Sequence, residues 1–314
     1  METKDAKRNA VVIYHGGCTD GFTAAWIFHR WYESQYDDVK YHAATYGELP
    51  PPVTSEDDVF ILDFSYAPEV VCNIACAAKS VELLDHHKTA KEAFDKFFTL
   101  DQEPIPNNLH VHFDMTKSGA GLAWERFRIT EEYGKIPLLV LHVQDYDLWK
   151  FEHPDTKPFI THLSIHEKSF AEWTAVHDYI EHGNGYDEFI TSGKVLDRQF
   201  ERLCNDIIAT GSKEITIDGI KGLGCNAPGM FASRIGNILA DRSGTFGATW
   251  YESKDGSTKF SLRSVGEFDV SGICRNYGGG GHRNAAGFTL EPKELVGGVV
   301  QLWSGKASDE TTGD

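Results

Sequence analysis

Short apolar segments that end at polar residues recur through the first hundred residues of the chain. Residues 10–14 form an apolar run that ends at His15, and the sequence then passes through two glycines into a helical pattern over 22–31. The apolar runs 58–62 and 81–84 lead in the same way into Asp63 and into Asp85-His86-His87. Each run has the length of a strand, and the glycines mark a strand–loop–helix transition.

Two further helices are predicted before residue 150. One runs from Gly119 to about Tyr133 with Ser118 as its N-cap, and the other runs from about Pro137 to Val143 and leads into Asp145. Strands that alternate with helices indicate an α/β fold, a doubly wound and mostly parallel sheet with helices on both faces. In such sheets ligands bind beyond the carboxyl ends of the strands, where the polar residues of this chain fall.

The second half of the chain has a different pattern. Residues 161–195 are irregular and aromatic, which indicates a helical connector. A helix from 196 onward is followed by β-like alternation over 214–218, 247–251 and 259–263, which predicts a smaller α/β domain. We therefore divide the chain into an N-terminal domain (1–160), the connector (161–195), a C-terminal domain (196–304) and a disordered tail (305–314).

Composition and charge narrow the class of protein. The chain has 314 residues, of which 41% are hydrophobic and 25% charged, as in ordinary soluble globular proteins. Its net charge of −17 repels a long polyanion, so we expect no long duplex nucleic acid among its partners. No apolar run approaches the roughly 18 residues of a membrane helix, and the first residues lack the layout of a signal peptide. We expect a cytoplasmic protein without a membrane partner.

Carboxylates and imidazoles gather at the predicted strand ends. Any one of them could be a cap or a turn residue, but an Asp-His-His tripeptide directly after an apolar strand favours a joint role. Such donors suit a divalent transition ion, with Mn²⁺ ahead of Mg²⁺ because imidazoles are present. An aspartate that bridges two ions roughly 3.5 to 4 Å apart is typical of phosphoester hydrolysis. The candidates are His15, Cys18, Asp20, Asp63, Asp85, His86, His87 and Asp145.

A glycine run near the C-terminus is a candidate for phosphate binding. Gly278 to Gly281 can adopt positive φ angles, which lets several backbone N–H groups converge on an anion. A bare glycine run is often only a flexible loop, but this one leads into His282 and the helix-compatible stretch Asn284-Ala-Ala-Gly287. The candidate substrate-binding residues here are Gly279, Gly280, Gly281, His282 and Asn284.

Three aromatic residues near these positions could stack on a nucleobase: Phe22, Tyr66 and Trp149. Core packing is the better explanation for Phe22. For Trp149, core packing and stacking remain equally open.

Taken together, the motifs resemble those of the DHH phosphoesterases. The glycine run, with His282 and Asn284, resembles the signature of the DHH-associated C-terminal domain, and the resemblance spans nearly the whole chain. The N-terminal motifs that carry it are His15-Gly-Gly-Cys18-Thr-Asp20, Asp63 in Leu-Asp-Phe-Ser, Leu84-Asp85-His86-His87 and Gln-Asp145-Tyr-Asp147.

The resemblance implies a role for each matching residue. His15 and Asp63 would hold one ion, and Asp63 would bridge to a second ion held also by Asp20, His86 and Asp145; Asp147 is a weaker candidate than Asp145. As the catalytic pair, Asp85 would orient His86 and His87 would face the substrate phosphate. Arg263 resembles the family's phosphate-binding arginine, whose planar fork suits a terminal phosphate, although an exposed strand-end charge is the alternative.

Cys18 departs from the family pattern, because most relatives carry Asp-x-Asp in the first motif. The thiol could ligate as a thiolate and favour a softer ion, leave the first metal site weak, or serve only as a small buried hydrophobe. The cysteine form resembles a subgroup of short-oligonucleotide nucleases, the nano-RNases or oligoribonucleases.

We therefore expect a phosphodiesterase that hydrolyses short single-stranded oligonucleotides, including linear dinucleotides, to nucleoside monophosphates. Two divalent ions, Mn²⁺ first, would activate the water. The alternatives are a 3′-phosphoadenosine 5′-phosphate phosphatase, a cyclic-dinucleotide phosphodiesterase and a pyro- or polyphosphatase. A protein of another class, a nucleotide-sensing module without turnover, also fits, and both a monomer and a homodimer remain open.

Overall fold

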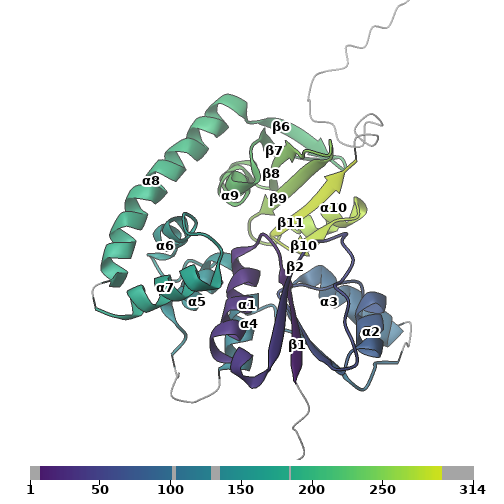
Figure 1. Ribbon diagram of the computed structural model, residues 1–314. Coiled ribbons are helices and arrows are strands. Elements are labelled where there is room, and N and C mark those ends of the chain that lie inside the picture. Colours follow the sequence, from purple (N-terminus) through teal and green to yellow (C-terminus); the bar gives the residue numbers. More distant parts are fainter. Residues whose placement is uncertain (1–7, 101–103, 129–134, 184, 292–314) are drawn as a thin grey trace, which may run out of the picture. The chain divides into compact units, whose positions relative to one another are not determined.

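The computed structural model describes residues 8–100, 104–128, 135–183 and 185–291 (Figure 1). The chain divides into two compact units, residues 1–198 and 199–314, and the boundary lies inside the long helix α8 (Gly185–Gly211). The predicted tail over 305–314 lies outside the described residues. Within the described ranges, no helix has both the length and the apolar character needed to cross a membrane.

The N-terminal unit contains a five-stranded sheet in which every neighbouring pair of strands is parallel. The spatial order is β2-β1-β3-β4-β5, which reverses direction between β1 and β3 and confirms the predicted doubly wound sheet. The two edge strands, β2 and β5, were not predicted, because they are only partly buried and carry a weak apolar signal. The strands are β1 (Asn9–His15), β2 (Asp38–Ala44), β3 (Asp57–Leu62), β4 (Ser80–Asp85) and β5 (Leu109–Phe113).

Helices cover both faces of this sheet (Figure 1). Successive strand residues point to opposite faces, so Val12 packs toward α1 (Thr19–Trp31) and α4 (Gly119–Phe127), whereas Ile13 packs toward α2 (Pro68–Ala77) and α3 (Lys88–Asp95). The first core continues into α5 (Leu138–Asp147), α6 (Thr156–Leu163) and α7 (Phe170–Glu181). Single helical turns occur at η1 (Glu33–Gln35) and η2 (Lys96–Leu100).

The two predicted helices before residue 150 are present with different ends. Ser118 caps α4 as predicted, since its side-chain oxygen accepts a hydrogen bond from the Gly121 N–H at 3.2 Å. This helix ends at Phe127 rather than near residue 133, and residues 129–134 lie outside the described part of the chain. Helix α5 extends past residue 143 to Asp147, so both aspartates of the last motif lie on its C-terminal turn.

The C-terminal unit is a six-stranded sheet in the order β10-β11-β9-β8-β7-β6. Only the β7–β8 pair among these is parallel. Helix α9 (Ala232–Ser243) and the end of α8 share a core on one face, and α10 (Val270–Asn276) packs on the other. The strands are β6 (Lys213–Ile217), β7 (Ile220–Asn226), β8 (Phe246–Glu252), β9 (Thr258–Ser264), β10 (Gly280–His282) and β11 (Ala285–Leu290), with one helical turn, η4, over Gly229–Phe231.

The reading of Asn284 to Gly287 as helix-compatible was wrong, because this stretch opens strand β11. Ala286 and Phe288 are buried and pair with residues of β9 in antiparallel register. The alternation of buried and less buried positions along β11 is that of a strand with one face on a core. Tertiary pairing with β9 therefore overrides the local preference of two alanines.

Candidate metal centre

The candidate metal centre lies where three neighbouring strands end. His15 is the last residue of β1, Asp63 follows the last residue of β3, and Asp85 is the last residue of β4. Because these strands are parallel neighbours, their carboxyl ends meet at one edge of the sheet. This edge includes the point between β1 and β3 where the strand order reverses, and open α/β sheets bind ligands at such a point.

Asp63 lies in the middle of the cluster. It is 1% exposed and has a φ of 56°, which is unusual for a residue with a side chain. Its Oδ2 lies 3.6 Å from His15 Nδ1 and its Oδ1 lies 3.0 Å from His86 Nε2, yet neither buried oxygen has the geometry of a hydrogen bond. Buried carboxylate oxygens nearly always have a partner, so this arrangement fits a cation between Asp63 and the imidazoles.

Two glycines leave room for the Asp63 side chain. A Cβ on Gly119, the first residue of α4, would lie 2.3 Å from the Asp63 Cβ. A Cβ on Gly21, in the first turn of α1, would lie 2.6 Å from the His15 Cβ and 3.0 Å from Asp63 Oδ2. Both helix starts therefore approach the strand ends by their backbones. Gly119 was not singled out in the sequence, because a glycine behind a capping serine carries no chemical signal.

The imidazole of His86 faces three carboxylates. Burial lowers the pKa of His86, but the three negative charges outweigh this effect and raise the pKa to about 10. A protonated ring thus supplies the positive charge that a divalent ion would otherwise bring to these oxygens. The distances from His86 Nε2 are 3.0 Å to Asp63 Oδ1, 3.5 Å to Asp147 Oδ2 and 3.8 Å to Asp20 Oδ2.

Asp20 joins helix α1 to the start of helix α4. Its carboxylate accepts hydrogen bonds from the backbone N–H groups of Gly119 at 2.5 Å and Ala120 at 3.1 Å. A carboxylate is favourable at a helix N-terminus, where the macrodipole is positive. Burial, followed by the charges of Asp63 and Asp147, nevertheless raises the pKa of Asp20 well above its usual value. The excess of negative charge again fits a bound cation.

Asp63 belongs to two groups of converging donor atoms. The donor atoms of Asp20, Asp63 and His86 lie within 4.8 Å of one another, and so do those of His15, Asp63 and His87. A shared carboxylate between two such groups has the donor set that a pair of bridged divalent ions requires. The residues present therefore fit the predicted metal site.

Asp85 fixes the backbone and ring that follow it. It is fully buried, and its Oδ1 accepts hydrogen bonds from the His86 N–H at 2.7 Å and the His87 N–H at 3.2 Å. The same oxygen lies 2.6 Å from His87 Nδ1, and Oδ2 accepts a hydrogen bond from Ser65 Oγ at 2.6 Å. The structure thus pairs Asp85 with the ring of His87, whereas the sequence reasoning paired it with the ring of His86.

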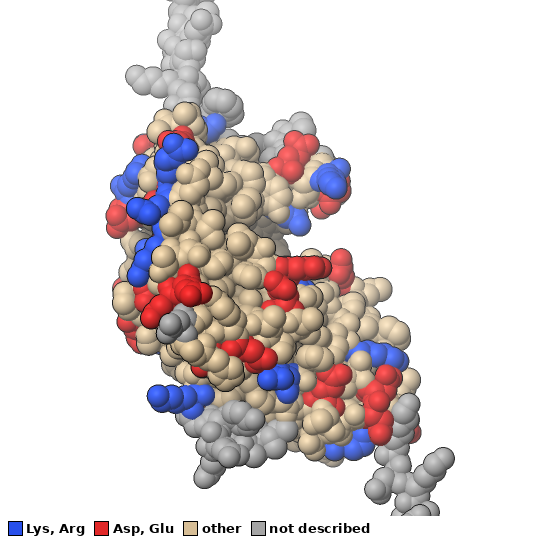
Figure 2. Space-filling model, turned by 60° about the vertical axis from the view of Figure 1, so that its left-hand side comes forward, with Lys and Arg blue, Asp and Glu red and all other residues tan. Residues whose placement is uncertain are grey.

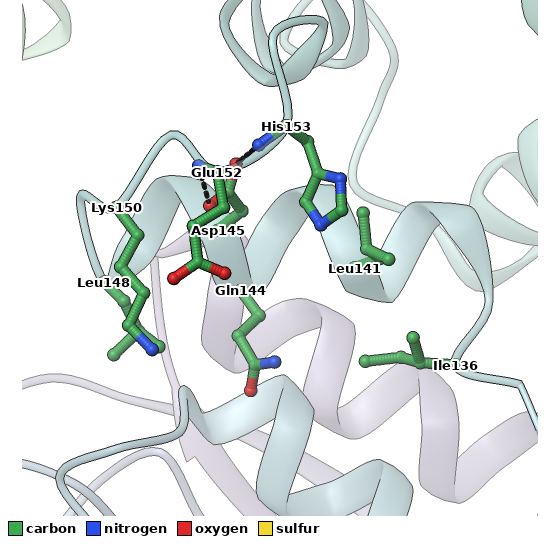
Figure 3. A pocket seen from close by; sticks show the side chains of 8 residues that line it. All are labelled: Ile136, Leu141, Gln144, Asp145, Leu148, Lys150, Glu152 and His153. Carbon is green, nitrogen blue, oxygen red and sulfur yellow. Dashed lines mark hydrogen bonds between the residues drawn. The ribbon is translucent and has the colours of Figure 1, made fainter.

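The two aspartates of α5 have different surroundings. Asp147 Oδ2 is buried, makes no hydrogen bond and lies near His86, so the structure brings Asp147 into the cluster. Asp145 is not brought there. Its carboxylate accepts hydrogen bonds from the N–H groups of Glu152 at 2.9 Å and His153 at 3.2 Å (Figure 3). It also accepts one from Thr156 Oγ1 at 2.5 Å. Residues two apart on an α-helix point about 200° apart, so only one of the two can face the strand ends.

Asp145 is also among the residues that line a small pocket beside the C-terminal part of α5 (Figure 3). The pocket measures about 110 Å³, below the roughly 300 to 1,000 Å³ of typical ligand sites. We therefore assign it no substrate. Its lining residues are Ile136, Leu141, Gln144, Asp145, Leu148, Lys150, Glu152 and His153.

Cys18 occupies the N-cap position of α1, beside the acidic cluster. Its side chain makes no capping hydrogen bond there. Burial, and then the charges of Asp63, Asp147 and Asp20, raise the pKa of the Cys18 thiol well above its usual value. Among the described residues, neither group of converging donor atoms includes Cys18.

In the C-terminal unit, Arg263 and His282 share one row of the sheet. Ala285 of β11 pairs with Arg263 of β9 on one side and with His282 of β10 on the other. Directly paired residues of antiparallel strands point to the same face, so both side chains lie on one face, about two strand spacings apart. The Arg263 guanidinium donates hydrogen bonds to the Leu262 carbonyl and to Ser233 Oγ, each at 2.9 Å.

The glycine run is partly an edge strand. A Cβ on Gly279 would lie 2.0 Å from the Gly287 carbonyl oxygen, and Gly278 and Gly281 have φ angles of 73° and 137°. The run therefore needs glycine for close backbone approach as well as for positive φ. Asn284 serves the fold here, since its side-chain N–H donates to Ser264 Oγ at 2.9 Å and to the Gly266 carbonyl at 3.0 Å.

Of the three aromatic residues considered for base stacking, two are core residues. Phe22 is 6% exposed and Tyr66 is 9% exposed, and both belong to the hydrophobic cores of the N-terminal unit. Trp149 has a φ of 54° and packs edge-on against Phe151, with ring centroids 4.7 Å apart.

Comparisons with known proteins give one domain match and several similar proteins. A family model of the DHHA1 domain matches residues 226–303. The chain is 31% identical over 324 residues to the uncharacterized protein R106 of Acanthamoeba polyphaga mimivirus, covering 94% of this chain and 72% of that protein. It is also similar to the pGpG-specific phosphodiesterase PggH of Vibrio (15% identity, 92% of this chain and 95% of that one, TM-score 0.45). RecJ of Thermus thermophilus in complex with Mn²⁺ is 14% identical, covering 92% of this chain and 50% of that one, with a TM-score of 0.49.

The family match lies in the C-terminal unit, which carries a DHHA1 domain. The strand-end motifs of the N-terminal unit resemble those of the DHH phosphoesterases, and the chain is a relative of the mimivirus protein R106.

A pair of variants tests the assignment of the last motif. We expect Asp147→Asn to weaken Mn²⁺ binding at least about 10-fold, because it removes a charged oxygen from the cluster. Asp145→Asn is the matched control: it should keep the Mn²⁺ affinity but lower the free energy of unfolding by about 1 to 3 kcal/mol, through loss of its hydrogen bonds. Isothermal titration calorimetry and urea denaturation measure the two effects, and the reverse pattern would return Asp145 to the metal set.

The role of Gly119 can be tested without removing any donor atom. Gly119→Ala places a Cβ where Asp63 lies, so we expect the displaced carboxylate to weaken Mn²⁺ binding at least about 10-fold. Gly272→Ala in α10 is the control, since a Cβ there meets nothing within 4 Å and alanine favours the helix. Equal Mn²⁺ affinities for both variants, measured by calorimetry, would refute the steric role.

Proposed function

We propose that the protein is a metal-dependent phosphodiesterase that hydrolyses short single-stranded oligonucleotides, including linear dinucleotides, to nucleoside monophosphates. Two divalent ions, with Mn²⁺ as the first candidate, would serve the reaction. The observation that carries the proposal is the membership of Asp63 in two converging donor groups at the strand ends.

The two groups of donor residues would each hold one ion. His15 and Asp63 would hold one, with His87 beside it, and Asp20, Asp63, His86 and Asp147 would hold the other. When bound, a pair of divalent ions supplies Lewis-acid activation of water and neutralises charge on the phosphate. Asp63 would set the spacing of the pair because the sheet, Gly21 and Gly119 hold its carboxylate in one place.

His87 and Asp85 would act on the substrate phosphate rather than on the ions. The contact of His87 Nδ1 with the Asp85 carboxylate places a proton on Nδ1 and directs Nε2 away from Asp85. Such an imidazole can contact a phosphate oxygen or pass a proton to the leaving oxygen. The hydrogen bond from Ser65 to the other oxygen of Asp85 keeps that carboxylate from rotating, which preserves the direction of the His87 ring.

A short substrate agrees with the charge of the chain. A long polyanion would need many cationic contacts, whereas the net charge is −17. On the face drawn in Figure 2, Lys and Arg side chains lie next to Asp and Glu side chains. In the C-terminal unit, Arg263 and His282 on one face of the sheet would contact a phosphate, as would the backbone of Gly279 to Gly281. A few such contacts suffice for a dinucleotide.

A hydrolysis assay tests this proposal. With Mn²⁺ present, we expect 5′-phosphorylated RNA of two to ten nucleotides to release mononucleotides, fastest from the shortest chains, and Asp63→Ala to lose at least about 100-fold in rate. The products are resolved by chromatography. Orthophosphate release from 3′-phosphoadenosine 5′-phosphate or from pyrophosphate alone would contradict the oligonucleotide specificity. Cleavage of a cyclic dinucleotide alone would contradict it too, and nucleotide binding without turnover would indicate a sensor.

The phosphate contact of Arg263 has its own test. We expect Arg263→Ala to raise the KM for a dinucleotide about 10- to 100-fold, because hydrogen bonds to a charged group contribute about 1.5 to 3 kcal/mol. Arg263→Lys should recover only part of this loss, since an ammonium cannot reproduce the planar fork. Arg242→Ala, an exposed arginine of α9 in the same unit, is the control. Steady-state kinetics that show equal KM values for both alanine variants would refute the role.

A further inference from the structure

An exposed tyrosine stands beside the candidate metal centre. β2 ends at Ala44, directly opposite His15 in the register of the sheet. The chain then turns over residues 45–48, where the Glu48 N–H donates to the Thr45 carbonyl at 3.1 Å and Gly47 has a φ of 92°. Glycine at the third position with positive φ is the signature of a type II turn, and it puts Tyr46 at the second position, on the corner.

The turn is held in place on both sides. Three consecutive prolines, residues 50–52, follow it and restrict the backbone. Before it, the Gly16 N–H donates to the Ala44 carbonyl at 2.8 Å, which ties the end of β2 to the loop after His15. The position of Tyr46 relative to His15 is therefore set by the backbone of the sheet rather than by a mobile loop.

The ring of Tyr46 rests on the cluster but is not buried by it. Its centroid lies 5.5 Å from that of His15 and 4.7 Å from that of Phe64, the fully buried residue that follows Asp63. The residue is nevertheless 57% exposed, in contrast to Phe22 and Tyr66, which belong to the cores. An aromatic ring that rests on His15 and Phe64 and is more than half exposed, next to a metal-ligand candidate, has the geometry of a stacking platform.

We propose that Tyr46 is a specificity-determining residue that stacks on a nucleobase of the substrate while the adjoining phosphate occupies the candidate metal centre. The inference rests on the proposed function and deepens it: the strand-end donors act on any phosphate, and Tyr46 favours esters that carry a base. In a nucleotide, one sugar separates the base from its phosphate. The ring of Tyr46 lies close to the metal-ligand candidate His15 in the same way, with ring centroids 5.5 Å apart. Every base offers a π-face, so the preference is for nucleotides over inorganic phosphates rather than for one base.

The test compares substrates with and without a base. The Mn²⁺-loaded full chain is assayed on a 5′-phosphorylated dinucleotide and on two analogues in which one or the other nucleotide is abasic. We expect Tyr46→Ala to lower kcat/KM about 10- to 100-fold on the dinucleotide and to leave it unchanged on the analogue that lacks the stacked base. Tyr46→Phe and Tyr46→Trp should retain the wild-type preference, because stacking needs the ring and not the hydroxyl.

One control variant and one contradicting outcome make the result decisive. Tyr179→Ala removes another exposed tyrosine, on α7, whose hydroxyl donates to Glu188, and it should change none of these ratios. An equal loss on the dinucleotide and on both analogues would overturn the inference, because Tyr46 would then act through His15 rather than through a base.

A binding measurement distinguishes two outcomes: that the role proposed for Tyr46 is wrong, and that the proposed function is wrong. The Kd of a 5′-mononucleotide for the Mn²⁺-loaded chain is measured by calorimetry for wild type and Tyr46→Ala, which needs no turnover. If no substrate is hydrolysed, the proposed function fails, and equal Kd values would overturn the role of Tyr46 as well. A Kd raised about 10-fold or more in Tyr46→Ala, with the Kd of inorganic phosphate unchanged, supports stacking.

Discussion

Buried negative charge at the ends of three parallel strands is the constraint on which the rest of this structure depends. Asp20, Asp63 and Asp147 converge on one imidazole, and two of them have raised pKa values because burial and mutual repulsion disfavour their ionised forms. Leaving water costs such groups several kcal/mol each unless a counter-charge is present. A counter-charge therefore stabilises the cluster. The protonated His86 ring supplies one, and the surrounding elements hold the oxygens in an arrangement that fits a bound cation.

Other carboxylates of the same region are satisfied internally and hold the cluster in shape. The Asp85 carboxylate accepts hydrogen bonds from Ser65, His86 and His87. Burial raises the pKa of Asp85, but the charge and the hydrogen bond of His87 outweigh this effect, so the pKa lies below its usual value. Asp145 closes the loop between α5 and α6. The distinction between orphaned and satisfied oxygens separates residues that would bind a ligand from residues that position them.

Much of the fold follows from local patterns. The buried strands β1, β3 and β4, the capped start of α4 and the alternation of strand and helix are visible in the sequence because burial on both faces produces continuous apolar runs. The edge strands β2 and β5 are not, since they are half exposed. The start of β11 was misread because its alanines fit a helix locally, and only the pairing with β9 makes them a strand.

The sequence by itself predicted the buried strands β1, β3 and β4, their parallel character and the donor residues at their ends, because strand ends of a parallel sheet must meet whatever the details of packing. Only the tertiary structure decided between Asp145 and Asp147, since residues two apart on a helix point in opposite directions and the rotation of α5 is set by its packing. It alone also brought Gly119 against Asp63 and Tyr46 against His15. These contacts join residues about 30 to 60 positions apart, whose nearness no local pattern records.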